Sequence, residues 1–247
     1  MSAYIGMGGG AKSVSKMYVG VDGKARQVQK AYIGVNGVAK LWYQRGTPLG
    51  SLAVGSTVKI KVNGAAKYFI VVHQGLPGSM YDASCNGTWL LQRYLYDAVS
   101  YNRDFYENSN THAYMNNTFF PQLEPDVQSI VKWVKIPFRD NTGAKGLDTR
   151  AFALAAIEIG KRPGDTDSGA VLAYFAAGNS AAATYENGSA GGWWTRTRFK
   201  NIFNNNSMYY VTSNGDVNNS AGTAAVRPCM IVQPETLVDE NRYVIGA

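Results

Sequence analysis

The sequence contains little of what metalloenzymes and disulfide scaffolds depend on. It has only two cysteines, Cys85 and Cys229, and only two histidines, His73 and His112. Two cysteines do not make a disulfide framework, so we expect two free thiols. Neither histidine has a partner at metal-ligand spacing, and no G-x-S-x-G elbow is present. We therefore expect no enzyme activity, although an Asp/Glu pair for glycoside hydrolysis stays open because sequence does not show carboxylate separation.

Long apolar runs and runs of basic residues are also missing. No stretch of 18 apolar residues occurs, and no basic segment followed by an apolar one opens the sequence, so we expect neither a membrane span nor a signal peptide. The net charge is +7, but the lysines and arginines are scattered. This scatter argues against a dedicated nucleic-acid binder. The positive charge either keeps the protein soluble or attracts it to an anionic partner such as an acidic cell-wall polymer.

What is present begins with an internal repeat. Residues 3–16, 17–30 and 31–44 read AYIGMGGGAKSVSK, MYVGVDGKARQVQK and AYIGVNGVAKLWYQ, so that Tyr4, Tyr18 and Tyr32 align. The central pairs are Gly8-Gly9, Asp22-Gly23 and Asn36-Gly37. These pairs tolerate positive φ at both centres of a type I′ turn. Each repeat is therefore predicted to be a small β-hairpin.

The repeat explains a stretch that resembles a phosphate-binding loop. In GMGGGAKS, residues 6–13, the Walker A pattern is matched except that Ala11 replaces the second glycine. Ala11 is the alanine of the repeat, and neither the buried strand nor the helix that such a loop needs is visible. We reject a nucleotide site.

The chain divides into three parts. Residues 1–44 form an attachment or assembly module, residues 45–50 (RGTPLG) form a linker, and residues 51–247 form a larger domain. The hairpins could instead be an N-terminal sheet of that domain. The larger domain is predicted to be α+β with an antiparallel sheet.

Within that domain, local patterns predict individual elements. A hairpin is expected at 57–72, a strand or helix at 88–99, a short helix at 110–123, and a helix followed by a strand at 124–138. A strand-like run covers 150–160 and a helix closed by Gly178 covers 168–178. Short strands are expected at 191–199, 208–217 and 224–232.

Three ordered blocks carry a family resemblance. They are WWTRT (193–197), YYVTSNGDV (209–217) and VRPCMIV (226–232). They resemble the C-terminal part of the C-type-lectin-like domains of the DUF6273 group, which read roughly W-W-L-R-S, Y-V-x-x-x-G and G-V-R-P-A. Thr195, Thr197 and Ala225 depart from that pattern. The resemblance covers residues 51–232 and implies a C-type-lectin-like fold.

The hairpin repeat resembles modules at the start of phage and prophage tail-associated proteins. This resemblance implies a virion protein that contacts other virion or tail proteins through residues 1–44, with a homotrimer as one possible assembly, and that leaves the cell by lysis. With a lectin-like head, the chain resembles receptor-binding proteins that recognise a bacterial surface glycan or protein. The alternative is a structural decoration or assembly protein of the virion that binds no receptor.

Asn and aromatic residues concentrate in residues 198–220. Amides match sugar hydroxyls, and aromatic rings stack on sugars or peptides. The alternative is a solvated turn region, which Asn and Gly favour for backbone reasons alone. The candidate ligand-binding residues are Phe199, Asn201, Phe203, Asn204, Asn205, Asn206, Tyr209, Asn214, Asp216, Asn218 and Asn219.

Other prominent residues are expected to be structural. Trp193 and Trp194 are expected in the core, and Arg196 and Arg227 in structural hydrogen-bonded pairs. Gln233-Pro234-Glu235 resembles a calcium-lectin loop, but it follows the last strand and no W-N-D triplet occurs. We therefore expect no calcium and no other cofactor.

Overall fold

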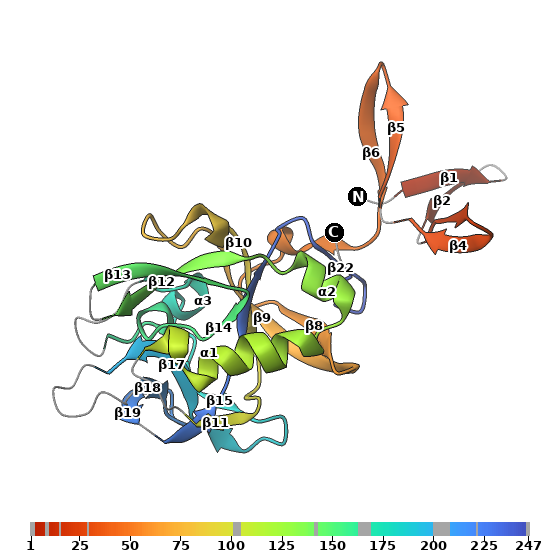
Figure 1. The fold of residues 1–247 in the computed structure, drawn as a ribbon. Coiled ribbons are helices and arrows are strands. Elements are labelled where there is room, and N and C mark those ends of the chain that lie inside the picture. Colours follow the sequence, from red (N-terminus) through yellow and green to blue (C-terminus); the bar gives the residue numbers. More distant parts are fainter. Residues whose placement is uncertain are drawn as a thin grey trace.

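The computed structural model describes residues 3–7, 10–14, 16–28, 30–100, 105–140, 143–162, 169–199, 208–220 and 222–245. It is an α+β protein with mostly antiparallel strands, as the sequence predicts. A globular body carries three hairpins at one end (Figure 1). Within the described residues, no helix is both long and apolar enough to cross a membrane.

The predicted repeats are hairpins. The paired strands are β1 (Ala3–Met7) with β2 (Gly10–Val14), β3 (Tyr18–Val21) with β4 (Lys24–Gln27), and β5 (Lys30–Val35) with β6 (Val38–Gln44). Asp22 and Gly23 have φ of 51° and 72°, and Asn36 and Gly37 have φ of 51° and 76°. Positive φ at both central positions is the type I′ geometry that the dipeptides predict. The Gly8-Gly9 pair lies outside the described residues.

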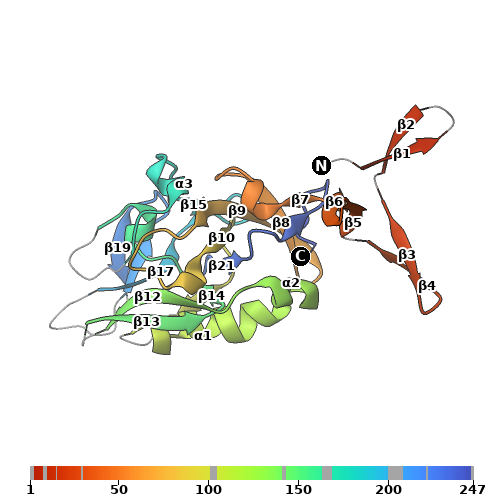
Figure 2. The same cartoon turned by 90° about the horizontal axis from the view of Figure 1, so that it is seen from above.

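The three hairpins do not join into one sheet. Each is a separate two-stranded ladder, and Figures 1 and 2 show them pointing in different directions from the body. Several apolar side chains of the second and third hairpins are exposed: Tyr18 is 56% and Tyr32 is 58% accessible. Two-stranded hairpins are marginal in water without something to pack against. The module therefore has surface available for a partner.

The segment predicted as a linker is anchored to the body. Strand β7 (Thr47–Pro48) pairs with β22 (Leu237–Val238), and the Leu49 amide donates to the carbonyl of Thr236 at 2.7 Å. The Leu49 side chain is fully buried. The end of the chain and the exit of the hairpin module thus meet in one ladder.

Two five-stranded sheets form the body. The first has the order β14-β21-β10-β9-β8 and the second β11-β20-β17-β18-β19. The first contains β8 (Thr57–Val62), β9 (Ala65–Gly75), β10 (Gly87–Gln92), β14 (Ala151–Phe152) and β21 (Cys229–Val232). The second contains β11 (Ala98–Ser100), β17 (Trp193–Arg198), β18 (Met208–Val211), β19 (Val217–Ser220) and β20 (Thr223–Ala225).

Smaller elements complete the body. The remaining ladders are β12 (Val134–Asp140) with β13 (Gly143–Thr149) and β15 (Ala183–Thr184) with β16 (Ala190–Gly191). The α-helices are α1 (Asn110–Tyr114), α2 (Pro125–Ile130) and α3 (Ala173–Ala176). A π-helical turn, Met115–Phe119, continues α1. The 3₁₀ turns are Leu49–Ser51, Ala83–Cys85, Tyr106–Asn108, Phe120–Gln122 and Ile157–Ile159.

The local predictions for the body are confirmed in part: the helix expected at 168–178 is limited to α3, and the strand expected at 208–217 is divided between β18 and β19. The hairpin at 57–72 turns at Asn63-Gly64 with φ of 49° and 73°. The run at 88–99, left open between strand and helix, is a strand only up to Gln92, in β10, and its last two residues begin β11. The strand-like run 150–160 is a strand only at its first positions, because the chain turns at Ile157–Ile159 and places the carboxylate of Glu158 in the interior.

The core has two hydrophobic clusters separated by the first sheet. On β10, Leu90 belongs to one cluster, while Trp89 and Leu91 belong to the other. Strands β9 and β21 divide their side chains in the same alternating way. Because both faces of the sheet are covered, β10 is buried along its whole length.

Candidate functional site

Strand β17 is a structural centre of the domain. Trp193 and Trp194 point to opposite clusters, and both are fully buried. Their indole N–H groups donate to Ala181 O at 3.0 Å and to Val99 O at 2.7 Å. The expectation that both tryptophans are core residues is confirmed, so neither ring is open to a ligand.

Arg196 forms the structural hydrogen-bonded pair that the sequence predicts, and its partner is Glu158. Its guanidinium donates to both carboxylate oxygens of Glu158, at 2.6 and 2.5 Å, and Tyr81 donates to the same carboxylate at 2.7 Å. Burial opposes the charged form of Arg196, but attraction and hydrogen bonds from Glu158 raise its pKa overall. The group is a buried, satisfied network rather than a reactive site.

Arg227 differs from Arg196. It is 3% exposed, and its Nε donates to the carbonyl of Gln92 at 2.9 Å. The expectation of a hydrogen-bonded structural arginine holds for Nε, but Nη1 has no hydrogen-bond partner. Burial lowers the pKa of Arg227 to about 10, so the guanidinium remains cationic at neutral pH.

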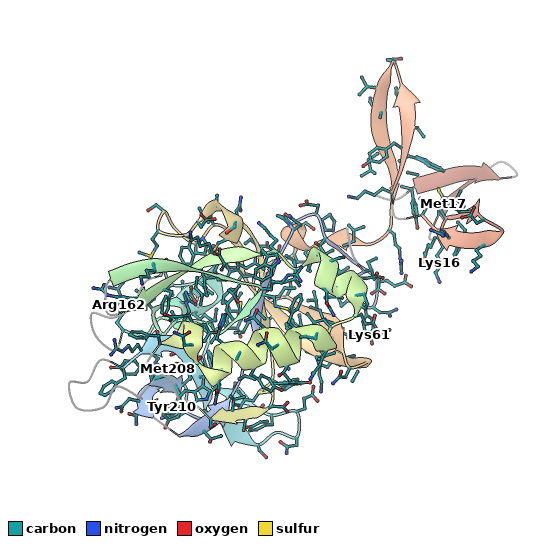
Figure 3. The ribbon with its side chains drawn as sticks, viewed as in Figure 1. Lys16, Met17, Lys61, Arg162, Met208 and Tyr210 are labelled. Atoms are coloured by element: carbon teal, nitrogen blue, oxygen red, sulfur yellow. The ribbon has the colours of Figure 1, made fainter. Side chains whose placement is uncertain are left out.

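The predicted ligand-binding residues fall in two groups. Asn201, Phe203, Asn204, Asn205 and Asn206 lie outside the described residues. The others lie on or beside β18 and β19, at the end of the body away from the hairpins. Figure 3 shows this separation, with Met208 and Tyr210 of β18 far from Lys16 and Met17.

Three of the described candidates gather on one face of the sheet. The rings of Phe199 and Tyr209 meet edge to face with centroids 5.4 Å apart, and Tyr209 is directly opposite Asn219 in the β18–β19 ladder. Asn218 is opposite Tyr210 and so lies on the other face. The tertiary structure therefore divides neighbouring asparagines between the two sides of an edge strand.

The turn between β18 and β19 holds the remaining candidates. Asn214 Nδ2 donates to the Asp216 carboxylate at 3.2 Å, and Lys161 forms an ion pair with Asp216 at 3.0 Å. Gly215 has a φ of +90°, and a Cβ there would come within 2.9 Å of Ala182 N. The turn is thus fixed against residues 180–182, and it presents Asn214 and Asp216 to solvent.

A cleft next to this turn was not identified from the sequence. It has a volume of about 330 Å³ and includes Ser213 of the turn, Arg93, Tyr94, Tyr174 and Arg227. The only sequence signal would have been the pair Arg93-Tyr94 directly after a buried strand. An exposed ring was also missed: Trp133 is 64% accessible, with the Arg150 guanidinium 5.3 Å from its centroid.

The cysteines and His112 are buried or half-buried. Cys85 and Cys229 are buried and unpaired, and burial raises the pKa of the Cys85 thiol to about 11. His112 contacts Glu107 O and Thr149 Oγ1 at 3.1 and 3.3 Å. Among the described residues, no group of three His, Cys, Asp or Glu side chains could hold a metal ion.

Comparison with known proteins identifies a family for the greater part of the body. The fold defines an α+β domain in which Trp193, Trp194 and Arg196 of β17 are buried in the core. Residues 86–234, more than half of the chain, match the family model described as a domain of unknown function, DUF6273. The chain belongs to the DUF6273 family. No curated protein and no solved structure matches it.

Proposed function

We propose that this protein is a bacteriophage virion component that binds the host cell surface without catalysis. Residues 1–44 attach it to other virion or tail proteins. The body, a C-type-lectin-like domain in this proposal, presents the surface of β18, β19 and their turn to a bacterial glycan or protein. The protein is assembled in the host cytoplasm and released with the virion by lysis.

The observation that carries the proposal is the separation of two surfaces. The hairpins expose Tyr18, Tyr32 and Val38, as a module that needs a partner would. The aromatic and amide residues near β18 lie at the opposite end of the body. Attachment at one end leaves the other end free to meet a cell. Many copies on one particle would raise a weak affinity by avidity.

Saturable binding to cells tests the proposal. The full chain is fluorescently labelled and titrated onto a panel of bacterial strains. The triple variant Asn204→Ala/Asn205→Ala/Asn206→Ala and the double variant Asn218→Ala/Asn219→Ala are compared with Asn108→Ala/Asn117→Ala, which also removes exposed amides. Loss of binding in the triple variant with an unchanged Tm supports the site. Binding should also weaken with added salt, because the chain carries a net charge of +7.

The same experiment separates the alternatives. Saturable binding that survives both site variants contradicts the surface we assign. No saturable binding, together with labelled protein in assembled particles, supports a structural decoration, which the exposed hairpins would serve equally well. Release of sugars from host envelopes would overturn the non-catalytic part of the proposal.

A further inference from the structure

The cleft beside the β18–β19 turn combines positive charge with hydroxyl groups. Arg93 and Arg227 supply two guanidinium groups, and Tyr94, Tyr174, Ser180 and Ser213 supply hydroxyls. None of the described residues that line it carries a carboxylate. Its volume of about 330 Å³ lies at the small end of the range for ligand pockets. The cleft is therefore suited to a compact, oxygen-rich anion.

Arg227 lines this wall and has an unused hydrogen-bonding group, the buried Nη1. Besides the bond from Nε to Gln92 O, Nη2 donates to Arg93 O at 3.4 Å, and the guanidinium lies 5.2 Å from the centroid of the Trp193 ring. These contacts hold the group in place without neutralising it. Buried charges are normally paired with an opposite charge, as Arg196 is with Glu158. An anion in the cleft would supply the missing acceptor and countercharge.

Arg93 places a second cation at the rim. It is exposed, its Nη1 reaches Thr57 Oγ1 at 3.5 Å, and its guanidinium lies 5.7 Å from the Tyr94 ring. An exposed arginine beside a buried one can follow a ligand into the cleft at little structural cost. On the other side, the Tyr174 ring approaches Gly55, where a Cβ would contact it at 3.9 Å. Aromatic faces thus flank the charged wall.

We propose that this cleft binds the oxyanion of an acidic sugar, with Arg227 and Arg93 contacting the carboxylate or phosphate and the tyrosine and serine hydroxyls contacting the sugar. Guanidinium groups form paired hydrogen bonds with both kinds of oxyanion. This inference deepens the proposed function by naming the ligand class, and its cell-surface meaning rests on that proposal. Because Ser213 belongs to the β18–β19 turn, the cleft is continuous with the surface already assigned.

Calorimetric titration of the full chain with small probes tests the cleft without cells. The probes are glucuronate, glucose 1-phosphate, inorganic phosphate and neutral glucose at low salt. We expect at least one acidic sugar to bind about tenfold or more tightly than glucose and than inorganic phosphate. Which acidic sugar binds better distinguishes a uronic acid from a sugar phosphate. Equal affinity for glucose, or no binding of either acidic sugar, would overturn the inference.

Variants assign the binding to the cleft. Arg93→Gln should weaken the acidic sugar about tenfold or more, while Arg162→Gln, which removes an exposed arginine outside the cleft, should not change it. Arg227→Met should abolish binding. If that variant does not fold, Arg93→Gln alone tests the site. Unchanged affinity of Arg93→Gln for the acidic sugar contradicts the proposed site. Acidic-sugar binding without cell adhesion would overturn the proposed function but leave the acidic-sugar site in place. Cell adhesion without acidic-sugar binding would overturn the acidic-sugar site but leave the proposed function in place.

Discussion

Two arginines at similar depth illustrate how a single residue's surroundings decide its role. Arg196 and Arg227 are 4% and 3% exposed. Two nitrogens of the Arg196 guanidinium donate to the two oxygens of the Glu158 carboxylate. The Arg227 guanidinium instead donates to main-chain carbonyls and lies over an aromatic ring. The first is satisfied within the fold, and the second keeps a buried donor, Nη1, without a partner. Identical chemistry thus stabilises the fold at one position and creates a candidate site at the other.

The Glu158–Arg196 pair is expected to be essential for stability. Glu158→Gln keeps the shape but leaves the Arg196 charge uncompensated in the core, which should cost about 3–5 kcal/mol in the free energy of unfolding. Glu124→Gln is the matched control. It breaks an ion pair with Lys61 at 3.3 Å in which both side chains are nearly half exposed, and it should cost about 0–1 kcal/mol. Urea unfolding measures both, and equal midpoints would contradict the buried-pair interpretation.

At the scale of elements, the hairpins are determined by short sequences. Asp22-Gly23, Asn36-Gly37 and Asn63-Gly64 all adopt positive φ at both positions, although the first two belong to exposed repeats and the third to a buried sheet. The turn type follows from the dipeptide because only residues that tolerate left-handed backbone can occupy both positions. Tertiary packing does not change this local preference.

A pair of glycines in one hairpin tests that local control. Gly37 has a φ of +76° and no atom near its missing Cβ, and Gly34 also has open space but no positive φ. Gly37→Ala should therefore destabilise the β5–β6 hairpin by about 1 kcal/mol through backbone strain alone. Gly34→Ala should be neutral or slightly stabilising. Amide hydrogen exchange in β5 and β6 of the full chain measures the difference, and equal protection in the two variants would contradict it.

Edge strands are less predictable than turns. Asn218 and Asn219 are adjacent in β19, but one lies opposite Tyr210 and the other opposite Tyr209. Their faces depend on the register with β18, and one step of register would exchange them. The sequence predicted an amide-rich binding region, a prediction that remains to be tested, but not which amides share a surface.

For the molecule as a whole, stability is expected to fall under mildly acidic conditions. Burial lowers the pKa of both His73 and His112 from the ordinary value of 6.5. His73 Nδ1 also accepts a hydrogen bond from Ala173 N at 3.2 Å, which requires that nitrogen to be unprotonated. The unfolded chain therefore binds more protons below pH 6.5, so stability is complete above that pH and is lost as pH falls towards the folded pKa values.

Urea midpoints measured from about pH 7.5 to about pH 5.5 test this dependence, in a range where most carboxylates stay ionised. The midpoint should decline as pH decreases. The double variant His73→Gln/His112→Gln should show a flatter profile, even if its stability at neutral pH is lower. A decline of equal steepness in the double variant would assign the effect to other groups.

The sequence by itself determined the hairpin repeats, the α+β class, the burial of Trp193 and Trp194, and the family to which the C-terminal blocks point. These features depend on local backbone preference and on apolar patterning, both of which are readable along the chain. Only the tertiary structure decided that the segment at 47–49 is held by the C-terminal strand, that asparagines of β19 are divided between faces, and that Arg227 lines a cleft with an unused donor. The physical reason is that burial, register and partner depend on distant contacts: the main-chain acceptor that orients Arg227 lies 135 residues earlier.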